Sequence, residues 1–237
     1  MATRLPSFPP SLRFGSLAIY PEKPRITPLQ KNAAAFIVSG VKRDAVTARP
    51  PHKSYIQIAI EQLVALMPGS VLEGFFDPAA VLVPLPGSAQ QRANSVSATR
   101  SICRALYDAD LGARVVPCLN RHKAVQKSAF AAPGQRPEAI DHFNSITVDL
   151  PVPESDLTTV LLVDDVLTRG ATSIGAATAI RARFPNAQIK LFALARTDPM
   201  GERFYDPCVG TIFCQPNGWV RRQNGVVEDG PASGRLF

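Results

Sequence analysis

Residues 160–173 read Val-Leu-Leu-Val-Asp-Asp-Val-Leu-Thr-Arg-Gly-Ala-Thr-Ser. The four apolar residues at the start are typical of a fully buried parallel strand. Two acids follow at the carboxyl end of that strand, and a short polar loop with one glycine comes next. Apolar residues then recur at helical spacing and predict a helix: Ile174, Ala177, Ile180 and Phe184. This order predicts a ligand site, because open α/β sheets bind ligands at the carboxyl ends of their strands.

The loop after the acids has the composition of a phosphate-binding turn. Backbone N–H groups at a helix N-terminus attract anions, and the helix dipole adds to that attraction. Thr168, Thr172 and Ser173 supply hydroxyl donors, and a glycine lets the backbone approach a ligand closely. The acid pair suits two adjacent sugar hydroxyls or a divalent cation. A strand that merely ends in two solvated acids would leave this loop unexplained, and the P-loop pattern is absent.

The stretch resembles the phosphoribosyl-pyrophosphate (PRPP) motif of type I phosphoribosyltransferases, and it is most similar to their ComF-like branch, which is linked to DNA-uptake operons. The resemblance implies that Asp164 and Asp165 are the catalytic acids. They would hold the ribose hydroxyls, stabilise developing positive charge and contact Mg²⁺ indirectly or through PRPP. The implied 5-phosphate site comprises Thr168, Arg169, Gly170, Ala171 and Thr172. Arg169 replaces the threonine or glycine common in the family, and it either adds charge to this site or points outward.

The same resemblance extends to the strand expected over residues 81–83. In the family, the turn after this strand receives the pyrophosphate of PRPP, which assigns Pro84 and Leu85 to substrate binding. Arg92 lies in Gln-Arg-Ala-Asn-Ser at residues 91–95, similar to the family's Arg-Gly-Phe-Asn element but without its glycine and phenylalanine. Arg92 would neutralise pyrophosphate, unless it is a surface arginine on a helix.

A polar and basic stretch covers residues 119–137. Loops of this length inside compact domains are often lids or binding loops. The family has a flexible loop here that closes over the site and excludes water, with Lys123 or Arg121 able to reach the pyrophosphate. A solvated loop is the alternative. We expect His122 and His142 to be surface polar residues, because the transfer needs no histidine base.

Alternating strand and helix patterns predict an α/β fold over residues 51–197. The expected class is a doubly wound, mainly parallel sheet of the type I phosphoribosyltransferase kind, with irregular N- and C-terminal additions. Besides the central strand, strands are expected over residues 81–83, 113–117, 143–148 and 189–195, and a helix over 55–67. Residues 33–41 predict a short strand or a helix. The lysine that follows an apolar run in ComF-like chains corresponds loosely to Lys42.

The two ends of the chain are expected to lie outside this core. Residues 1–50 predict a basic, proline-rich arm or hood segment, since six prolines fall within residues 1–31. Residues 1–53 hold nine Lys or Arg and two acids, which equals the whole net charge of +7. This segment is either a solvated or surface-packed arm, or a basic arm that contacts nucleic acid or an acidic protein partner. Residues 198–237 lack clear periodicity and form a C-terminal extension and second candidate for the hood.

Composition sets broad limits on the protein. The chain has 237 residues, of which 46% are hydrophobic and 19% charged, as in globular proteins. No apolar run reaches the roughly 18 residues of a membrane span, and no secretory signal is evident, so we expect a cytoplasmic protein without membrane contact. The four cysteines lack C-x-x-C spacing, which favours free thiols over a zinc site.

Three functions remain open at this stage. The first is a phosphoribosyltransferase of nucleotide metabolism that binds PRPP with Mg²⁺ and transfers the phosphoribosyl group to a nucleobase or amine nitrogen. The second is a catalytically silent PRPP- or nucleotide-binding regulator that acts with nucleic acid or a protein partner. The third is another phosphosugar enzyme, such as a phosphohydrolase. The cysteine-rich ribbon usual in ComF-like proteins is missing, since no cysteine precedes Cys103, and the fold often forms homodimers.

Overall fold

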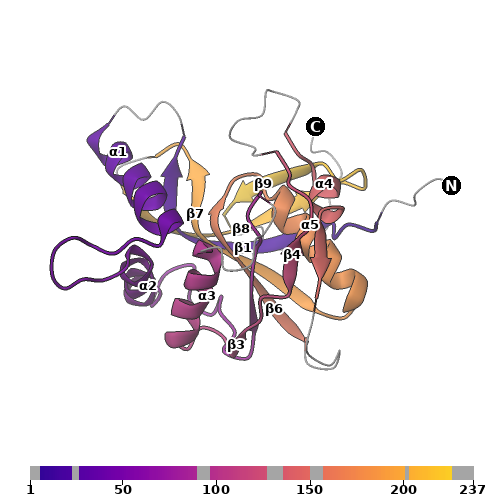
Figure 1. Ribbon diagram of the computed structural model, residues 1–237, viewed down its shortest axis with the longest axis horizontal. Coiled ribbons are helices and arrows are strands. Elements are labelled where there is room, and N and C mark those ends of the chain that lie inside the picture. Colours follow the sequence, from indigo (N-terminus) through magenta and orange to yellow (C-terminus); the bar gives the residue numbers. More distant parts are fainter. Residues whose placement is uncertain are drawn as a thin grey trace.

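The structure, a computed structural model, describes residues 6–22, 27–89, 97–126, 136–149, 157–200 and 203–225 (Figure 1). Its central strands are β1 (Ser11–Pro21), β2 (Val81–Pro84), β3 (Arg114–Val115), β6 (Thr159–Leu167), β7 (Gln188–Asp198), β8 (Tyr205–Cys214) and β9 (Val220–Asn224). A separate ribbon pairs β4 (Leu119–Arg121) with β5 (Ile146–Val148). The α-helices are α1 (Pro28–Ala35), α2 (Tyr55–Leu66), α3 (Ala98–Asp108), α4 (Ala139–Phe143) and α5 (Ala171–Arg183).

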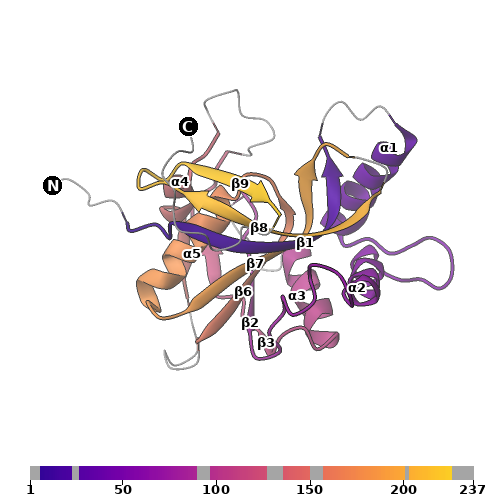
Figure 2. The same ribbon diagram turned by 180° about the vertical axis from the view of Figure 1, so that it is seen from behind.

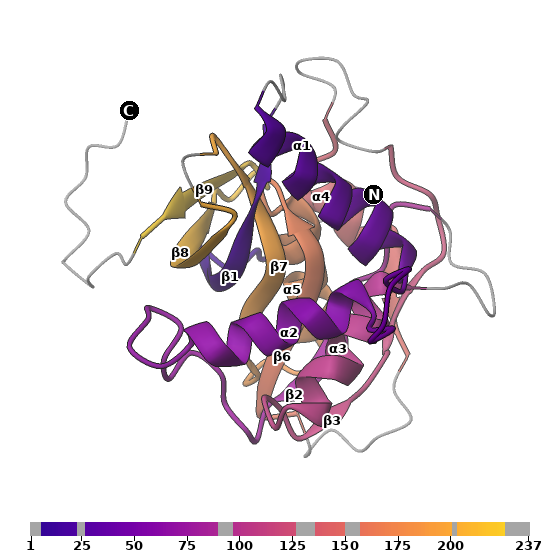
Figure 3. The same ribbon diagram turned by 90° about the vertical axis from the view of Figure 1, so that its left-hand side faces the viewer.

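The central sheet has the order β3-β2-β6-β7-β1-β8-β9. The first five strands in this order are parallel, and β8 and β9 join them antiparallel at one edge. Helices α2 and α3 lie over one face, as seen in Figure 3, while α5 lies over the other. The predicted α/β class with a mainly parallel sheet is therefore confirmed, and the arrangement is compatible with a doubly wound fold.

Strand β6 shows why the sheet is covered on both sides. Its apolar residues alternate between two cores: Val160 and Leu162 pack with α5, whereas Leu161 and Val163 pack with α3. All four are buried, as expected for a central strand of a parallel sheet. This strand thus supplies apolar side chains to the cores on both faces of the sheet.

The N-terminal segment contributes a strand to the core, so the expectation that residues 1–50 lie outside the core as an arm or hood is wrong for β1. This strand lies between β7 and β8, and both Phe14 and Leu17 are fully buried within it. Its proline content misled the prediction because Pro10 precedes the strand and Pro21 ends it. Proline is tolerated at strand ends, where it removes no ladder hydrogen bond from the interior.

The C-terminal extension is also not a separate irregular addition over its described part. Strands β8 and β9 continue the central sheet beyond β1 (Figures 1 and 2). The prediction missed β8 because its interior contains Pro207 and Gly210, which weaken a strand pattern. Gly210 is required by close packing, since a Cβ atom there would lie 2.3 Å from the carbonyl oxygen of Gln223.

Several local predictions are confirmed. The helix expected from Tyr55 is α2, and it begins with a capping box in which Ser54 and Gln57 exchange hydrogen bonds. Residues 33–41 are helical, since α1 is followed by a π-helix (Phe36–Gly40) and a 3₁₀ turn (Val41–Arg43). The strand expected over residues 143–148 begins later, at Ile146, because α4 occupies the preceding residues.

The cysteines and the helices bear on two further expectations. All four cysteines are buried, and none of them forms a disulfide. Within the described ranges, no helix combines the length and hydropathy that crossing a membrane requires.

The central position of β1 makes a direct prediction about stability. Replacing Phe14 by Ala should lower the free energy of unfolding by about 3–5 kcal/mol, because it empties a fully buried site in the core. Its neighbour Arg13 is exposed, so Arg13→Ala should change stability by about 0.5 kcal/mol or less. Urea denaturation of both variants measures this, and equal stabilities would mean that β1 is a peripheral arm.

Candidate functional site

The candidate site lies at the point in the sheet between β2 and β6. From β2 the next strand is added on one side, and from β6 the next strand is added on the other side. These strands are parallel neighbours, with Pro84 opposite Val163. The N–H of Leu85 continues this pairing by donating to the carbonyl oxygen of Val163 over 2.9 Å. The helices that follow the two strands cover opposite faces of the sheet, so their connecting loops diverge at the carboxyl edge. Such switch points are where open α/β sheets bind ligands.

The acid pair lies inside the last part of β6 rather than after it, because the strand continues to Leu167. Alternation along the strand separates the two carboxyl groups. Asp164 lines a hollow at the start of α5, whereas Asp165 forms an ion pair with Lys42 over 3.4 Å between Nζ and Oδ2. The 3₁₀ turn after α1 thus brings Lys42, which the family pattern indicated only loosely, to the acid pair.

The two carboxyl groups differ in their electrostatic surroundings. Burial, and secondly the carboxylate of Asp165, raise the pKa of Asp164 well above its ordinary value. Lys42 and the backbone N–H of Asp165, which donates to Asp164 Oδ1 over 2.9 Å, act in the opposite direction. Ionised Asp164 is therefore held at a cost in stability that an added cation or hydroxyl donors would offset.

The hollow beside Asp164 has the features of an anion site. Its volume is about 50 Å³, and it is lined by His142, Asp164 and residues 166–173. The first N–H groups of α5 have no partner within the helix, which leaves them available to a ligand. Ser173 is one of the lining residues, and its hydroxyl is buried, with the residue 1% exposed, and has no hydrogen-bond partner among the described residues. Buried polar atoms are rarely left unpaired, so this hydroxyl points to a ligand.

Gly170 determines the shape of the loop. It is the N-cap of α5 with a φ of 95°, a conformation that favours glycine. Its Cα also packs against β8, since a Cβ atom there would lie 2.6 Å from Cδ1 of Ile212. The glycine in the sequence motif therefore serves both the turn and the contact with the C-terminal strand.

One sequence expectation is corrected at this hollow, because His142 is not a surface residue. It is 4% exposed, and its ring nitrogens lie 3.3 and 3.4 Å from Thr172 Oγ1. Close packing of α4 on α5 brings it there. A Cβ atom on Gly175 would lie 2.7 Å from Cβ of His142, so only glycine allows this approach. By contrast, His122 is exposed as expected.

Arg121 also departs from the prediction, since it is buried rather than part of an open lid. It donates from Nε to the carbonyl oxygen of Gly87 over 2.5 Å and from Nη1 to Ser145 Oγ. Its Nη2 lies 3.4 Å from His142 Nδ1. Burial lowers its pKa to about 10. Arg121 thereby connects the turn after β2 with the histidine of the hollow, and it is not available to swing onto a substrate.

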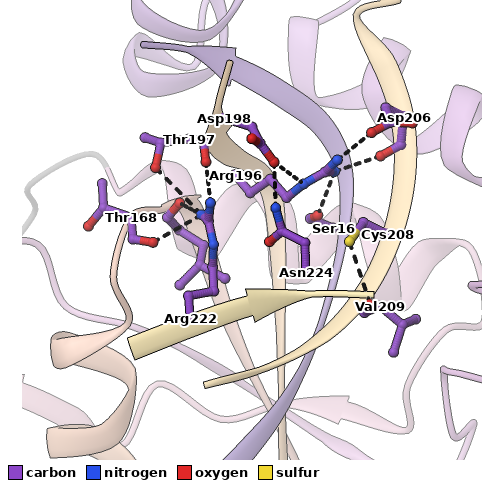
Figure 4. Close-up of polar contacts among 11 residues, drawn as sticks. Ser16, Thr168, Arg196, Thr197, Asp198, Asp206, Cys208, Val209, Arg222 and Asn224 are labelled. Carbon is purple, nitrogen blue, oxygen red and sulfur yellow. Dashed lines mark hydrogen bonds and ion pairs between the residues drawn. The ribbon is translucent and has the colours of Figure 1, made fainter. Parts of the chain in front are cut away.

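Arg222 of β9 supports the loop from the other side (Figure 4). Its Nη1 donates to the carbonyl oxygens of Leu167 and Thr168, over 3.0 Å in each case. Its Nη2 donates to the carbonyl oxygen of Thr197 at the end of β7. The sequence contained no periodic signal for this residue, because β9 is short and mostly polar.

A second buried arginine ties neighbouring strands together at the same edge of the sheet. Arg196 of β7 donates to Ser16 of β1 and to the backbone carbonyl of Asp206 in β8, and it forms ion pairs with Asp198 and with the Asp206 carboxylate (Figure 4). One side chain therefore links β7, β1 and β8.

The other predicted site residues have varied positions. Arg169 is half-buried and donates to the carbonyl oxygen of Pro137 over 3.2 Å, so it contacts the segment before α4. Burial and nearby Arg136 lower its pKa. Lys123 is exposed, in a segment whose Val125 N–H donates to the carbonyl oxygen of Ser88. Arg92 and residues 127–135 of the expected lid lie outside the described residues.

The residues around the acid pair can be compared with the ligands that a Mg²⁺ ion needs. No cluster of three or more His, Cys, Asp or Glu suited to a metal occurs in the described part of the chain. Among the described residues, Asp164 and Asp165 are the carboxylates that this position offers, and such a pair would suit a Mg²⁺ ion that takes its remaining ligands from substrate phosphates and water.

Comparison with known proteins adds no family assignment. A scan against models of protein families finds no match, and a search of curated proteins finds no related sequence.

The contacts of Arg222 predict how the loop responds to its loss. Arg222→Ala should raise the hydrogen-exchange rates of the first hydrogen-bonded amides of α5, from Ile174 on, because it removes charged donors worth about 1–3 kcal/mol from three carbonyl groups that hold the preceding loop. The exposed neighbour Arg221 provides the control, and Arg221→Ala should leave these rates unchanged. Unchanged rates in both variants would contradict the supporting role.

The raised pKa of Asp164 predicts a stability gain on its neutralisation. A carboxyl whose folded-state pKa is raised stabilises the fold below its ordinary pKa, near 3.8, and that contribution is lost as pH rises through the folded-state pKa. Asp164→Asn should therefore exceed wild type in unfolding free energy at pH 8, by on the order of 1 kcal/mol. The difference should shrink toward pH 4. Exposed Asp108→Asn is the control, and an Asp164→Asn variant less stable than wild type at pH 8 would refute the prediction.

Proposed function

We propose that the protein binds PRPP with Mg²⁺ in the crevice between β2 and β6 and transfers the phosphoribosyl group to a nitrogen nucleophile, a nucleobase or an amine, with release of pyrophosphate. One observation carries this proposal. A hollow formed by the loop after β6 and the start of α5 lies next to the acid pair at the end of β6. The buried hydroxyl of Ser173 and the first N–H groups of α5 are hydrogen-bond donors without a described partner, and an anion would accept from them. The carboxylate beside them calls for hydroxyl donors or a cation.

The hollow is suited to the 5-phosphate of the substrate. A phosphate there would accept hydrogen bonds from the N–H groups of the first turn of α5 and from Ser173 Oγ, and it would gain from the helix dipole. The glycine at the N-cap gives the loop the positive φ with which the chain turns into α5. Arg169 contacts Pro137 on the rim and contributes positive charge nearby.

The acid pair is suited to the ribose. Two adjacent hydroxyl groups donate to carboxylates, which relieves the burial of Asp164. Lys42 forms an ion pair with Asp165 and opposes the rise in the pKa of Asp164. During transfer the anomeric carbon develops positive charge, and fixed carboxylates near the ribose stabilise that charge electrostatically.

The turn after β2 is suited to the pyrophosphate. It lies beside the acid pair, and its conformation is held by Arg121 at Gly87 and by Thr99, which donates to the carbonyl oxygen of Leu85 over 2.9 Å. Mg²⁺, held by Asp164 and Asp165 indirectly or through PRPP, would supply positive charge to neutralise the departing pyrophosphate. Lys123 and Arg92 are the candidate cationic side chains for the same task.

Calorimetric titration with PRPP and Mg²⁺ tests the binding step. Wild type should bind with a single saturable site, and Asp164→Asn/Asp165→Asn should weaken PRPP binding at least about tenfold through loss of hydroxyl and metal contacts. The control is Asp108→Asn/Asp110→Asn, which removes the same charge from α3 and the turn after it. Retained binding by the first variant would exclude the acid pair as the ribose site.

A second assay separates an enzyme from a binding protein. Wild type is mixed with PRPP, Mg²⁺ and a panel of nucleobases and amines, and released pyrophosphate is measured. Release that depends on one nucleophile and is lost in the acid-pair variant supports transfer. PRPP binding without release by any nucleophile would favour a regulator, and no binding by folded wild type would refute the proposal.

A further inference from the structure

His142 faces the hollow from outside the loop that forms it. It belongs to α4, which packs closely on α5 at Gly175, where a larger residue would collide with α4. The imidazole is buried and lines the hollow together with Asp164 and the loop. Its ring nitrogens lie 3.3 and 3.4 Å from Thr172 Oγ1, a hydroxyl of the first turn of α5. A ring nitrogen of His142 is therefore within reach of a group bound at that helix end.

Arg121 determines which nitrogen of this imidazole carries the proton. Nη2 of Arg121 lies 3.4 Å from His142 Nδ1, and a guanidinium can only donate hydrogen bonds. Nδ1 must therefore accept, which leaves the proton of the neutral ring on Nε2. Arg121 cannot readily turn away, because Gly87 and Ser145 accept its other donors.

The charges around His142 oppose a second proton on the ring. Arg121 of β4 contacts it directly, and Arg169 of the β6–α5 loop adds further positive charge. Asp141 of its own helix acts in the opposite direction, and Asp164 of β6 lines the same hollow. Burial and, next, Arg121 lower the pKa of His142 to about 4.

We propose that His142 is a phosphate ligand of the hollow that donates from Nε2–H as a neutral imidazole, in the tautomer imposed by Arg121. The inference rests on the proposed function, because it assumes that the hollow takes the phosphate of a phosphorylated sugar. Arg121 is then a positioning residue for both ends of the site, since it holds the imidazole and the Gly87 turn at once. A neutral donor keeps its own proton across the range in which free histidine titrates, so its contribution to phosphate binding does not change through its own titration.

Calorimetric affinity for ribose 5-phosphate and for inorganic phosphate tests the ligand role. His142→Ala should bind both at least about tenfold more weakly than wild type, because a buried donor to an anion is lost. His142→Gln keeps an amide donor of similar reach and should recover much of the affinity. Exposed His122→Ala is the control and should bind as wild type does. Circular dichroism and thermal unfolding establish that each variant is folded.

The protonation state is tested on the unaltered protein. In ¹⁵N NMR spectra at pH 5.5, 6.5 and 7.5, with and without ribose 5-phosphate, His142 should keep the signature of a neutral Nε2–H ring. The affinity ratio of wild type to His142→Ala should stay constant over the same range. An imidazolium signature in the complex, or a ratio that grows as pH falls, would overturn the neutral-donor inference.

The outcomes distinguish this inference from the proposed function. If wild type binds ribose 5-phosphate and folded His142→Ala binds it equally well, His142 is not a ligand and the proposed function stands. If folded wild type binds PRPP with Mg²⁺ but neither ribose 5-phosphate nor inorganic phosphate, the inference fails and the proposed function stands; if it binds none of the three, both fail.

Discussion

Strands β2 and β6 hydrogen-bond to each other while the helices that follow them leave toward opposite faces of the sheet. In open α/β sheets, the carboxyl ends of two strands whose connections diverge in this way are where ligands bind. The parallel register puts Pro84 beside Val163, which brings the turn after β2 next to the acid pair at the end of β6. Changing that register by one residue would move every one of these groups to another face or level.

Some polar groups at the proposed site lack the stabilising partners that buried polar groups in a protein core usually have. Asp164 sits in surroundings that oppose its charge, and Ser173 buries a hydroxyl without a partner in the described residues. Rigid neighbours hold these unfavourable positions: Arg222 anchors the loop, and Arg121 anchors the turn and His142. Local violations of folding rules in a well-packed protein are expected at sites where a ligand supplies the missing partners.

The sequence allowed the central part of this arrangement to be predicted, because strong local signals coincide there. An apolar strand, a glycine with positive φ and a helical pattern occur together between residues 160 and 184, and each is a local property of the chain. Strand β1 was not predictable in the same way, since its flanking prolines resemble those of an irregular arm while its burial depends on β7 and β8.

The side chains that surround the loop were also beyond sequence reasoning. Arg121, His142 and Arg222 lie on three elements distant from the motif in sequence, and their hydrogen bonds exist only once the sheet and α4 are packed. The available signal was indirect. Gly175 interrupts an otherwise regular helix, and an isolated glycine there indicates a close approach by another element. The structure identifies that element as α4.

A crystal structure of the protein with ribose 5-phosphate tests the central claim most directly. The predicted result places the phosphate in the hollow, within hydrogen-bond distance of the first N–H groups of α5 and of Ser173 Oγ, with the ribose hydroxyls on Asp164 and Asp165. A phosphate bound elsewhere, or a ribose directed away from the acid pair, would contradict the assignment of this crevice as a phosphosugar site.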